Sequence, residues 1–148
     1  LMILEENMAL ADAVDIELST EKKRRDKLVE KAKEKQIPVI ISAHNFEKTP
    51  DEATMLKTIA TEFRAGASVA KIAVMAHSNN DILKVLNVTH EASEMGDICT
   101  IAMGEAGKLT RVVAPLLGSC ITYASAGEPT APGQLSVQAI NRVLEVLK

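Results

Sequence analysis

Short apolar runs alternate along the chain with longer segments in which apolar residues recur at the spacing of a helix face. The runs are rich in β-branched residues, so they predict strands. Five such runs are present: 14–18, 38–44, 69–75, 98–102 and 120–123. Most of them are apolar on both faces, which favours a parallel sheet covered by helices, as in α/β proteins.

The segments between these runs carry the start and stop signals of helices. We expect Thr20 to cap the first full helix and Thr49 to cap the second, which ends at Gly66. Ser78, with Asp81 three residues later, predicts a capping box at the start of the next helix. Further helical segments are predicted within 1–12, over 109–117 and over the last residues of the chain.

Composition places the chain among globular proteins of one domain, residues 1–148. Of the 148 residues, 47% are apolar and 25% are charged, which excludes disorder. No apolar run reaches the ~20 residues of a membrane span, and a net charge of −3 with two Phe and no Trp argues against nucleic-acid binding. Cys99 and Cys120 lack metal-ligand spacing, so free thiols in a reducing cytoplasm are expected.

The alternation of strands and helices fits two architectures, an open doubly wound sheet and part of a (β/α)8 barrel. In both, functional sites form at the carboxyl ends of the strands. A complete barrel requires eight strands and typically ~250 residues, so this chain is too short for one. Because it begins Leu1-Met2-Ile3 rather than with an initiator Met, we expect it to be a portion of a longer chain.

Lys71 is the polar residue that stands out within the third predicted strand. Its neighbours in 69–75 are Val, Ala, Ile, Ala, Val and Met, and burial of an ammonium among them costs several kcal/mol unless a partner compensates. Burial lowers the pKa of a lysine, which predicts a neutral amine able to attack a carbonyl and form a Schiff base. The alternative is a lysine that protects a sheet edge against aggregation.

Other polar residues stand near strand ends. His44 ends the second predicted strand on the same face as Ser42, where a general base would stand. Asp15 and Glu17 lie in the first predicted strand, with a solvated edge or an ion pair as the alternative interpretation. No pair of histidines with a carboxylate forms the pattern of a metal triad, so no metal is expected.

Arg111 lies just inside the helix predicted after the fourth strand. There its guanidinium could hold a carboxylate through two hydrogen bonds, and a surface arginine is the alternative. The preceding sequence Gly-Glu-Ala-Gly, residues 104–107, lacks the pattern of a phosphate-binding loop. We interpret it as a tight turn between strand and helix.

Five segments, read together, resemble one family. They are 14–18 (VDIEL), 42–46 (SAHNF), 70–75 (AKIAVM), 102–111 (AMGEAGKLTR) and 131–137 (APGQLSV). Their order and spacing closely resemble those of the type I 3-dehydroquinate dehydratases, over essentially the whole chain. The resemblance implies a (β/α)8 TIM barrel, represented here by about five βα units, and the dehydration of 3-dehydroquinate to 3-dehydroshikimate in the shikimate pathway without an added cofactor.

The resemblance also implies roles for single residues. Lys71 corresponds to the Schiff-base lysine and His44 to the general acid/base, while Arg111 would hold the substrate carboxylate. Asp15 would stand behind the histidine, with Glu17 as a second supporting carboxylate. The remaining implied site residues are Met103, which would line the pocket, and Thr130 and Gln134, which belong to a Gly- and Pro-rich lid, residues 124–134, expected to be mobile without ligand.

The front of the family's barrel has no counterpart in this sequence. The first three strands, a Glu-x-Arg-x-Asp segment, a further substrate-contacting arginine and the glutamate that partners the histidine are not found. We therefore expect the chain to correspond to the C-terminal five units, with two exposed sheet edges that favour association over a stable closed barrel.

The expected partner is the small-molecule substrate 3-dehydroquinate, with a homodimer as the assembly considered and neither nucleic acid nor membrane as a partner. Two functions of other kinds stay open. One is another Schiff-base barrel enzyme, such as a class I aldolase, and the other is a non-catalytic fragment or binding module.

Overall fold

A single parallel sheet organises the structure, a computed structural model that describes residues 2–128 and 130–147. Its four strands are hydrogen-bonded in chain order, β1-β2-β3-β4. They are β1 (Val14–Glu17), β2 (Val39–Asn45), β3 (Val69–Met75) and β4 (Ile98–Met103). The α-helices are α1 (Met2–Asn7), α2 (Lys22–Glu34), α3 (Glu52–Arg64), α4 (Asn79–Ala92), α5 (Thr110–Val113) and α6 (Val137–Leu147). Three short 3-10 helices complete the described elements: η1 (Met8–Leu10), η2 (Ala106–Leu109) and η3 (Ala114–Leu117).

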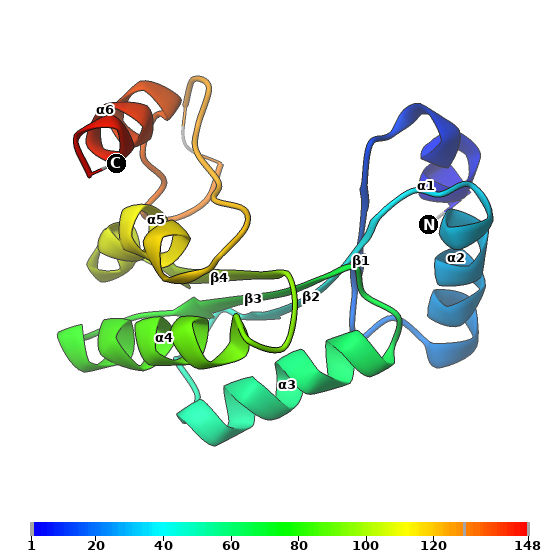
Figure 1. Ribbon diagram of the computed structural model, residues 1–148, viewed down its shortest axis with the longest axis horizontal. Helices are drawn as coiled ribbons and strands as arrows, with labels where there is room; N and C mark the ends of the chain where they lie inside the picture. The colour runs from blue at the N-terminus through cyan, green and yellow to red at the C-terminus, as the bar shows by residue number, and fades with distance from the viewer. Residues whose placement is uncertain (1, 129, 148) are drawn as a thin grey trace.

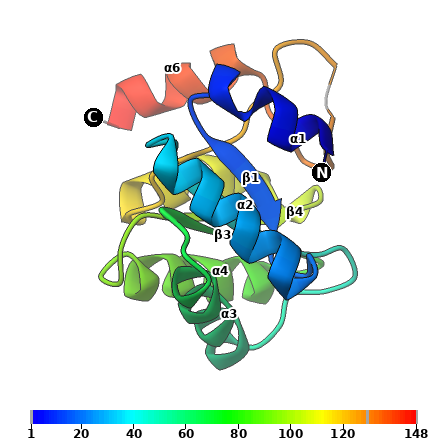
Figure 2. The same cartoon turned by 90° about the vertical axis from the view of Figure 1, so that its right-hand side faces the viewer.

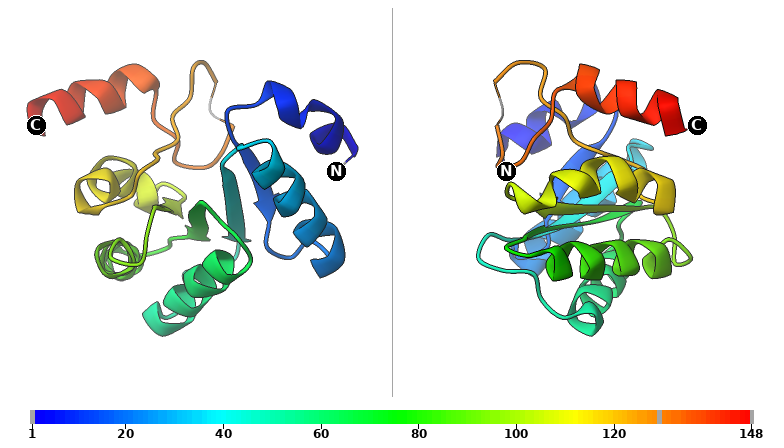
Figure 3. Two further views of the ribbon diagram at one scale, coloured as in Figure 1. Left: turned by 45° about the vertical axis from the view of Figure 1, so that its right-hand side comes forward. Right: turned by 90° about the vertical axis from the view of Figure 1, so that its left-hand side faces the viewer.

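The helices follow the curve of the sheet on its outer side. Figure 1 shows α3 and α4 packed beneath the strands, and Figure 2 shows α2 lying against β1. In the left view of Figure 3 the helices form an open arc from α6 through α5, α4, α3 and α2 to α1. The arrangement is that of a partial barrel.

Two apolar clusters hold the outer face of the sheet to its helices. One joins α3 and α4 to β3 and β4, and its fully buried members include Ile59, Val85, Val88 and Ile98. The other joins α2 to β1 and β2. These contacts fill most of the outer face, where Thr100 binds the Thr89 hydroxyl of α4, and the ionisable residues of the strands lie on the inner face.

The register of the strands aligns those polar residues in rows. Glu17 pairs with Ser42, Ser42 with Lys71, and Lys71 with Cys99, so one residue from each strand lies in a single row across the sheet. His44 lies two residues beyond Ser42 and therefore on the same face.

The predicted fifth strand, 120–123, does not form a strand. Its backbone pairing with β4 is limited, among the described residues, to an isolated bridge between Ile98 and Ser119 and one hydrogen bond from the Cys120 N–H to the Ile98 carbonyl. The Ser119 hydroxyl accepts the hydrogen bond of the Thr100 N–H, the position where the carbonyl of a further strand would bind. The described residues therefore hold four strands, one fewer than the sequence predicts.

Helix starts agree with the sequence in part. The capping box of Ser78 and Asp81 is confirmed. Thr20 and Thr49 are not caps: the carboxylates of Glu21 and Asp51 bind the free N–H groups of α2 and α3 instead. A carboxylate at this position also compensates the positive end of the helix dipole.

The predicted helix 109–117 is divided into η2, α5 and η3, with Pro115 at the start of the last segment. Gly118 ends it in the left-handed conformation, with φ of 110°. In the lid segment 124–134, Pro129 lies outside the described residues.

Candidate active site

A pocket of 240 Å³ opens on the inner side of the sheet, near the carboxyl ends of β2, β3 and β4. Its lining includes six of the residues that the sequence singles out: His44, Lys71, Met103, Arg111, Thr130 and Gln134. The other two, Asp15 and Glu17, bind Lys71 and His44 from β1. Segments up to 90 residues apart along the chain are therefore brought to one place, at the strand ends where sites of α/β folds form.

Lys71 lies deep in this pocket, on an interior strand rather than at a sheet edge. The residue is only 7% exposed. Its Nζ atom donates a hydrogen bond to Oδ2 of Asp15 at 2.7 Å and stands 4.6 Å from the centre of the Tyr123 ring. The edge-lysine interpretation is wrong, because β3 pairs with a strand on each side. A carboxylate and an aromatic face compensate the buried charge.

The pKa of Lys71 contradicts the expectation of a neutral amine in the unliganded pocket. Burial alone lowers it, and this is the largest single effect. The hydrogen bond and charge of Asp15, with smaller contributions from Tyr123 and Cys99, together outweigh burial and raise the pKa of Lys71 above its ordinary value. The resting state is therefore an ammonium paired with a carboxylate.

His44 forms its own hydrogen-bonded pair with a carboxylate next to Lys71. Its Nδ1 atom stands 2.6 Å from Oε2 of Glu17, and its backbone N–H donates to Oε1 of the same carboxylate. Its ring also stacks on Phe46, with 5.7 Å between ring centres. The expectation that Asp15 stands behind the histidine is wrong, because Glu17 takes that place and Asp15 serves Lys71. We expected no counterpart of the glutamate that partners the histidine in the family, and this expectation is wrong, because Glu17 of β1 is that partner.

Arg111 is buried, so its interpretation as a surface residue is wrong. It is 3% exposed, and burial lowers its pKa. Its guanidinium donates hydrogen bonds to the carbonyls of Tyr123, Pro132 and Gly133 at 2.9–3.2 Å. Three of its five N–H groups are bound in this way, which fixes the plane of the guanidinium at the wall of the pocket.

The end of the lid segment rests against the turn that follows β4. Gly133 has φ of 71°, and a Cβ atom there would lie 2.1 Å from the Gly104 carbonyl, so only glycine fits. Thr130 donates from its N–H, at 2.7 Å, and from its hydroxyl to Oε1 of Gln134. These two predicted substrate ligands therefore bind each other at the rim of the pocket.

Three neighbours of the predicted residues are not anticipated from the sequence in these roles. Tyr123 lies over the lysine, Phe46 stacks on the histidine, and the hydroxyl of Ser42 stands 2.5 Å from Asp15. Ser42 carried a signal, because it shares a strand face with His44. Tyr123 lies in the predicted strand 120–123, which does not form, so the sequence does not indicate that its ring faces Lys71.

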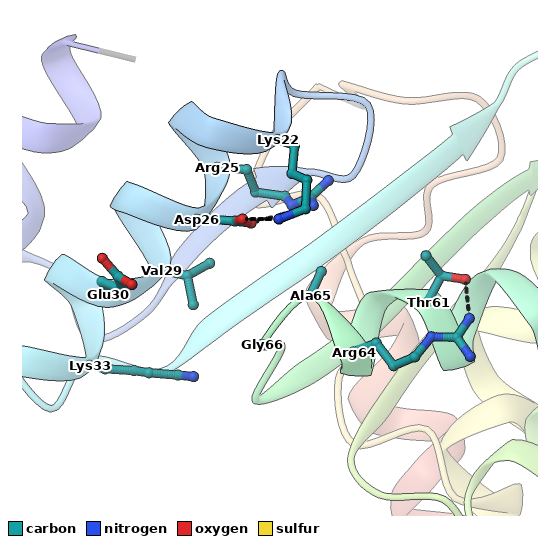
Figure 4. A pocket seen from close by; sticks show the side chains of 10 residues that line it. All are labelled: Lys22, Arg25, Asp26, Val29, Glu30, Lys33, Thr61, Arg64, Ala65 and Gly66. Carbon is teal, nitrogen blue, oxygen red and sulfur yellow. Dashed lines mark hydrogen bonds and ion pairs between the residues drawn. The ribbon is translucent and has the colours of Figure 1, made fainter.

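A larger hollow lies on the outer surface, between α2 and the end of α3 (Figure 4). Several of its polar groups bind one another: Lys22 pairs with Asp26 at 2.5 Å, and Arg64 donates to the Thr61 hydroxyl at 2.9 Å. Its lining lacks histidine and cysteine. We therefore place the candidate site on the inner face of the sheet.

Comparisons with known proteins agree with this placement. The family model of type I 3-dehydroquinase matches residues 1–148. A curated 3-dehydroquinate dehydratase of Methanococcoides burtonii is 47% identical over 146 residues, which are 99% of this chain and 61% of that protein. The enzyme of that name from Methanosarcina acetivorans is 51% identical over 140 residues, 93% of this chain and 58% of that protein.

Solved structures give the same result. The chain superimposes on 3-dehydroquinate dehydratase from Geobacillus kaustophilus with a TM-score of 0.93 at 33% identity, covering 99% of this chain and 58% of that one. For the type I enzyme of Clostridium difficile with covalently modified comenic acid, the TM-score is 0.92 at 33% identity, with 99% and 59% covered. The chain thus spans about three fifths of the length of these relatives. It belongs to the type I 3-dehydroquinase family.

Proposed function

We propose that this pocket dehydrates 3-dehydroquinate to 3-dehydroshikimate through a Schiff base on Lys71. The observation that carries the proposal is the position of one buried amine between a histidine and an arginine in a pocket of 240 Å³. The amine can bind a ketone, the imidazole can move protons beside it, and the guanidinium can attract a carboxylate. The name of the family and those of its relatives support the choice of substrate.

Substrate binding begins with the carboxylate at Arg111. Backbone carbonyls already fix the guanidinium, so its remaining N–H groups are held ready for an anion with little loss of side-chain freedom. Gln134 and Thr130 stand at the rim, where exchange of their mutual hydrogen bond for substrate hydroxyls would bring the lid end over the pocket.

The covalent step starts when Lys71 transfers a proton to the imidazole of His44 and its neutral nitrogen attacks the ketone carbon. The ketone oxygen takes a proton from the added nitrogen and becomes a hydroxyl. His44 supplies a proton to the resulting hydroxyl, which leaves as water and gives the iminium. The iminium draws electrons from the adjacent carbon, from which His44 removes a proton. The β-hydroxyl then leaves as water, protonated by the same imidazolium, and hydrolysis of the iminium releases product and regenerates the amine. Each positioned proton transfer is typically worth about 10²–10⁴-fold.

Reduction with borohydride tests the proposal directly. With 3-dehydroquinate present, the tryptic peptide containing Lys71 is expected to gain the mass of the reduced adduct. Lys71→Met should abolish this labelling, whereas the exposed Lys57→Met should leave it unchanged. Labelling with the phosphorylated ketones that class I aldolases use, but not with 3-dehydroquinate, would contradict the choice of substrate.

The proposed compartment is the cytoplasm. Both cysteines are free thiols: Cys99 is buried in the sheet, and Cys120 is exposed. An exposed thiol without a partner is typical of a reducing environment. Fractionation of cells that express the protein tests this assignment.

A further inference from the structure

Ser42 occupies a central position among the ionisable groups of the pocket. It lies in β2, is 1% exposed, and pairs in register with Glu17 on one side and Lys71 on the other. Its side chain bears one hydroxyl proton and stands between two carboxylates. The Oγ atom is 2.5 Å from Oδ1 of Asp15 and 3.3 Å from Oε2 of Glu17.

These contacts join the Lys71–Asp15 ion pair and the His44–Glu17 hydrogen bond through the one hydroxyl proton of Ser42, which faces both carboxylates. The path runs from Nζ of Lys71 to Asp15 at 2.7 Å, through the Ser42 hydroxyl to Glu17, and from Glu17 to Nδ1 of His44 at 2.6 Å. The groups come from three strands. Ser42 is the one member of the path whose side chain does not ionise, and it is the most deeply buried.

The two carboxylates depend on this hydroxyl to different degrees. Glu17 is held by two groups of His44, the ring nitrogen and the backbone N–H, in addition to Ser42. Asp15 has two partners among the described residues, Lys71 and Ser42, and its side chain is 36% exposed. Without the hydroxyl, the Asp15 side chain is free to turn toward solvent, where water competes with the lysine.

We propose that Ser42 is a positioning residue that holds the Asp15 carboxylate on Lys71 and ties it to the Glu17–His44 pair. Its benefit for the reaction rests on the proposed function, because it keeps the amine aimed at the ketone and next to the imidazole that exchanges protons with it. A misplacement of about 1 Å between reacting groups can lower a rate by about 10²-fold.

The first test needs no substrate. NMR titration of lysine labelled with ¹³C at Cε reports the pKa of Lys71, assigned with Lys71→Met. Ser42→Ala should lower this pKa by about half a unit to one unit, in the same direction as Asp15→Asn but by less. Tyr123 and Cys99, the other titratable groups that act on Lys71, are present in every variant.

Ser119→Ala is the matched control, because it removes another buried serine hydroxyl at the edge of the same sheet, outside the pocket lining. It should leave the pKa of Lys71 unchanged even if it lowers the melting temperature. A pKa in Ser42→Ala equal to that of the unaltered chain would overturn the proposal.

The second test measures the rate of borohydride trapping against the concentration of 3-dehydroquinate. Ser42→Ala should lower the rate at saturation about 10-fold or more and change the half-saturating concentration less than about twofold. An unchanged saturated rate overturns the kinetic part of the proposal. If the unaltered chain traps no 3-dehydroquinate, the proposed function fails. The NMR titration still tests whether Ser42 holds Asp15 on Lys71, because it needs no substrate.

Discussion

Two buried ionisable groups lie on opposite faces of the sheet, and only one of them has a hydrogen-bonded partner among the described residues. Lys71, on the inner face, is paired with Asp15 and faces Tyr123. Glu62, on α3 and packed toward the outer face, is 0% exposed, and neither of its carboxylate oxygens has a hydrogen-bond partner among the described residues. Burial raises the pKa of Glu62 to about 9, with the charge of Glu17 adding to the effect. The comparison indicates that burial without a paired opposite charge favours the neutral form of a group, whereas a hydrogen-bonded partner of opposite charge favours the charged form.

The largest effect is expected at the paired lysine. Lys71→Met should reduce imine trapping by at least about 10⁴-fold, because no other described amine lines the pocket. Thermal unfolding should change little, since the Asp15 side chain is 36% exposed and its carboxylate can turn toward water once the ammonium is removed. If this variant still traps the ketone, the reactive amine is not Lys71, the lysine that is paired with Asp15.

His44 extends the comparison to the second pair of the pocket, the hydrogen bond between its ring and Glu17. His44→Ala should lower the rate of imine trapping by about 10²-fold or more, since it removes the proton donor beside the ketone. His77 and His90 provide controls, because His77 binds the Glu47 carbonyl and His90 is exposed on α4. Equal losses in the three alanine variants would indicate a general effect on folding rather than on chemistry.

Glu62 should dominate the pH dependence of stability. The unfolded chain ionises this carboxyl near pH 4.5, whereas the folded chain keeps it protonated up to about pH 9. The folded state therefore binds more protons within this window, so the free energy of unfolding falls as pH rises from about 4.5 to 9.

Glu62→Gln should remove most of that decline, because an amide does not ionise. Denaturant unfolding at pH 6 and pH 8.5 measures the difference, with Glu47→Gln at an exposed site as the control. Parallel stability profiles for the unaltered chain and Glu62→Gln would contradict the assignment of a protonated carboxyl.

The smallest effect is expected from the aromatic face over Lys71. A cation over a ring contributes roughly 0.5–2 kcal/mol, so Tyr123→Leu should lower the pKa of Lys71 by about half a unit. Tyr123→Phe keeps the ring and should preserve most of the effect. Equal titrations of Lys71 in the leucine and phenylalanine variants would exclude a contribution from the ring.

Local signals in the sequence predicted much of the fold. The strand 69–75 and the box of Ser78 and Asp81 depend on residues close together in the chain, and both form as expected. The segment 120–123 has strand composition, but the Ser119 hydroxyl takes the hydrogen bond that would extend the ladder. Competition between a side chain and the backbone for one N–H cannot be inferred from composition.

The site was predicted as a set of residues but not as a set of contacts. Lys71 and Asp15 are 56 positions apart, and the strand register aligns Lys71 with Ser42 and Glu17 rather than with Asp15, so their pairing is seen only in the side-chain contact. Their pairing reverses the direction of the pKa shift expected from burial alone. Glu62 did carry a signal, since it follows Met55 and Ile59 at helical spacing on the buried face of α3.

The row Glu17–Ser42–Lys71–Cys99 makes the chemistry of the pocket a measure of correct assembly. A shift of β2 by one residue would turn Ser42 and His44 to the outer face together, because side chains alternate along a strand. Secondary structure would survive such a shift almost unaltered, so circular dichroism would not detect it. The rate at which Lys71 captures a ketone thus serves as a folding sensor that separates chains with native register from compact chains without it.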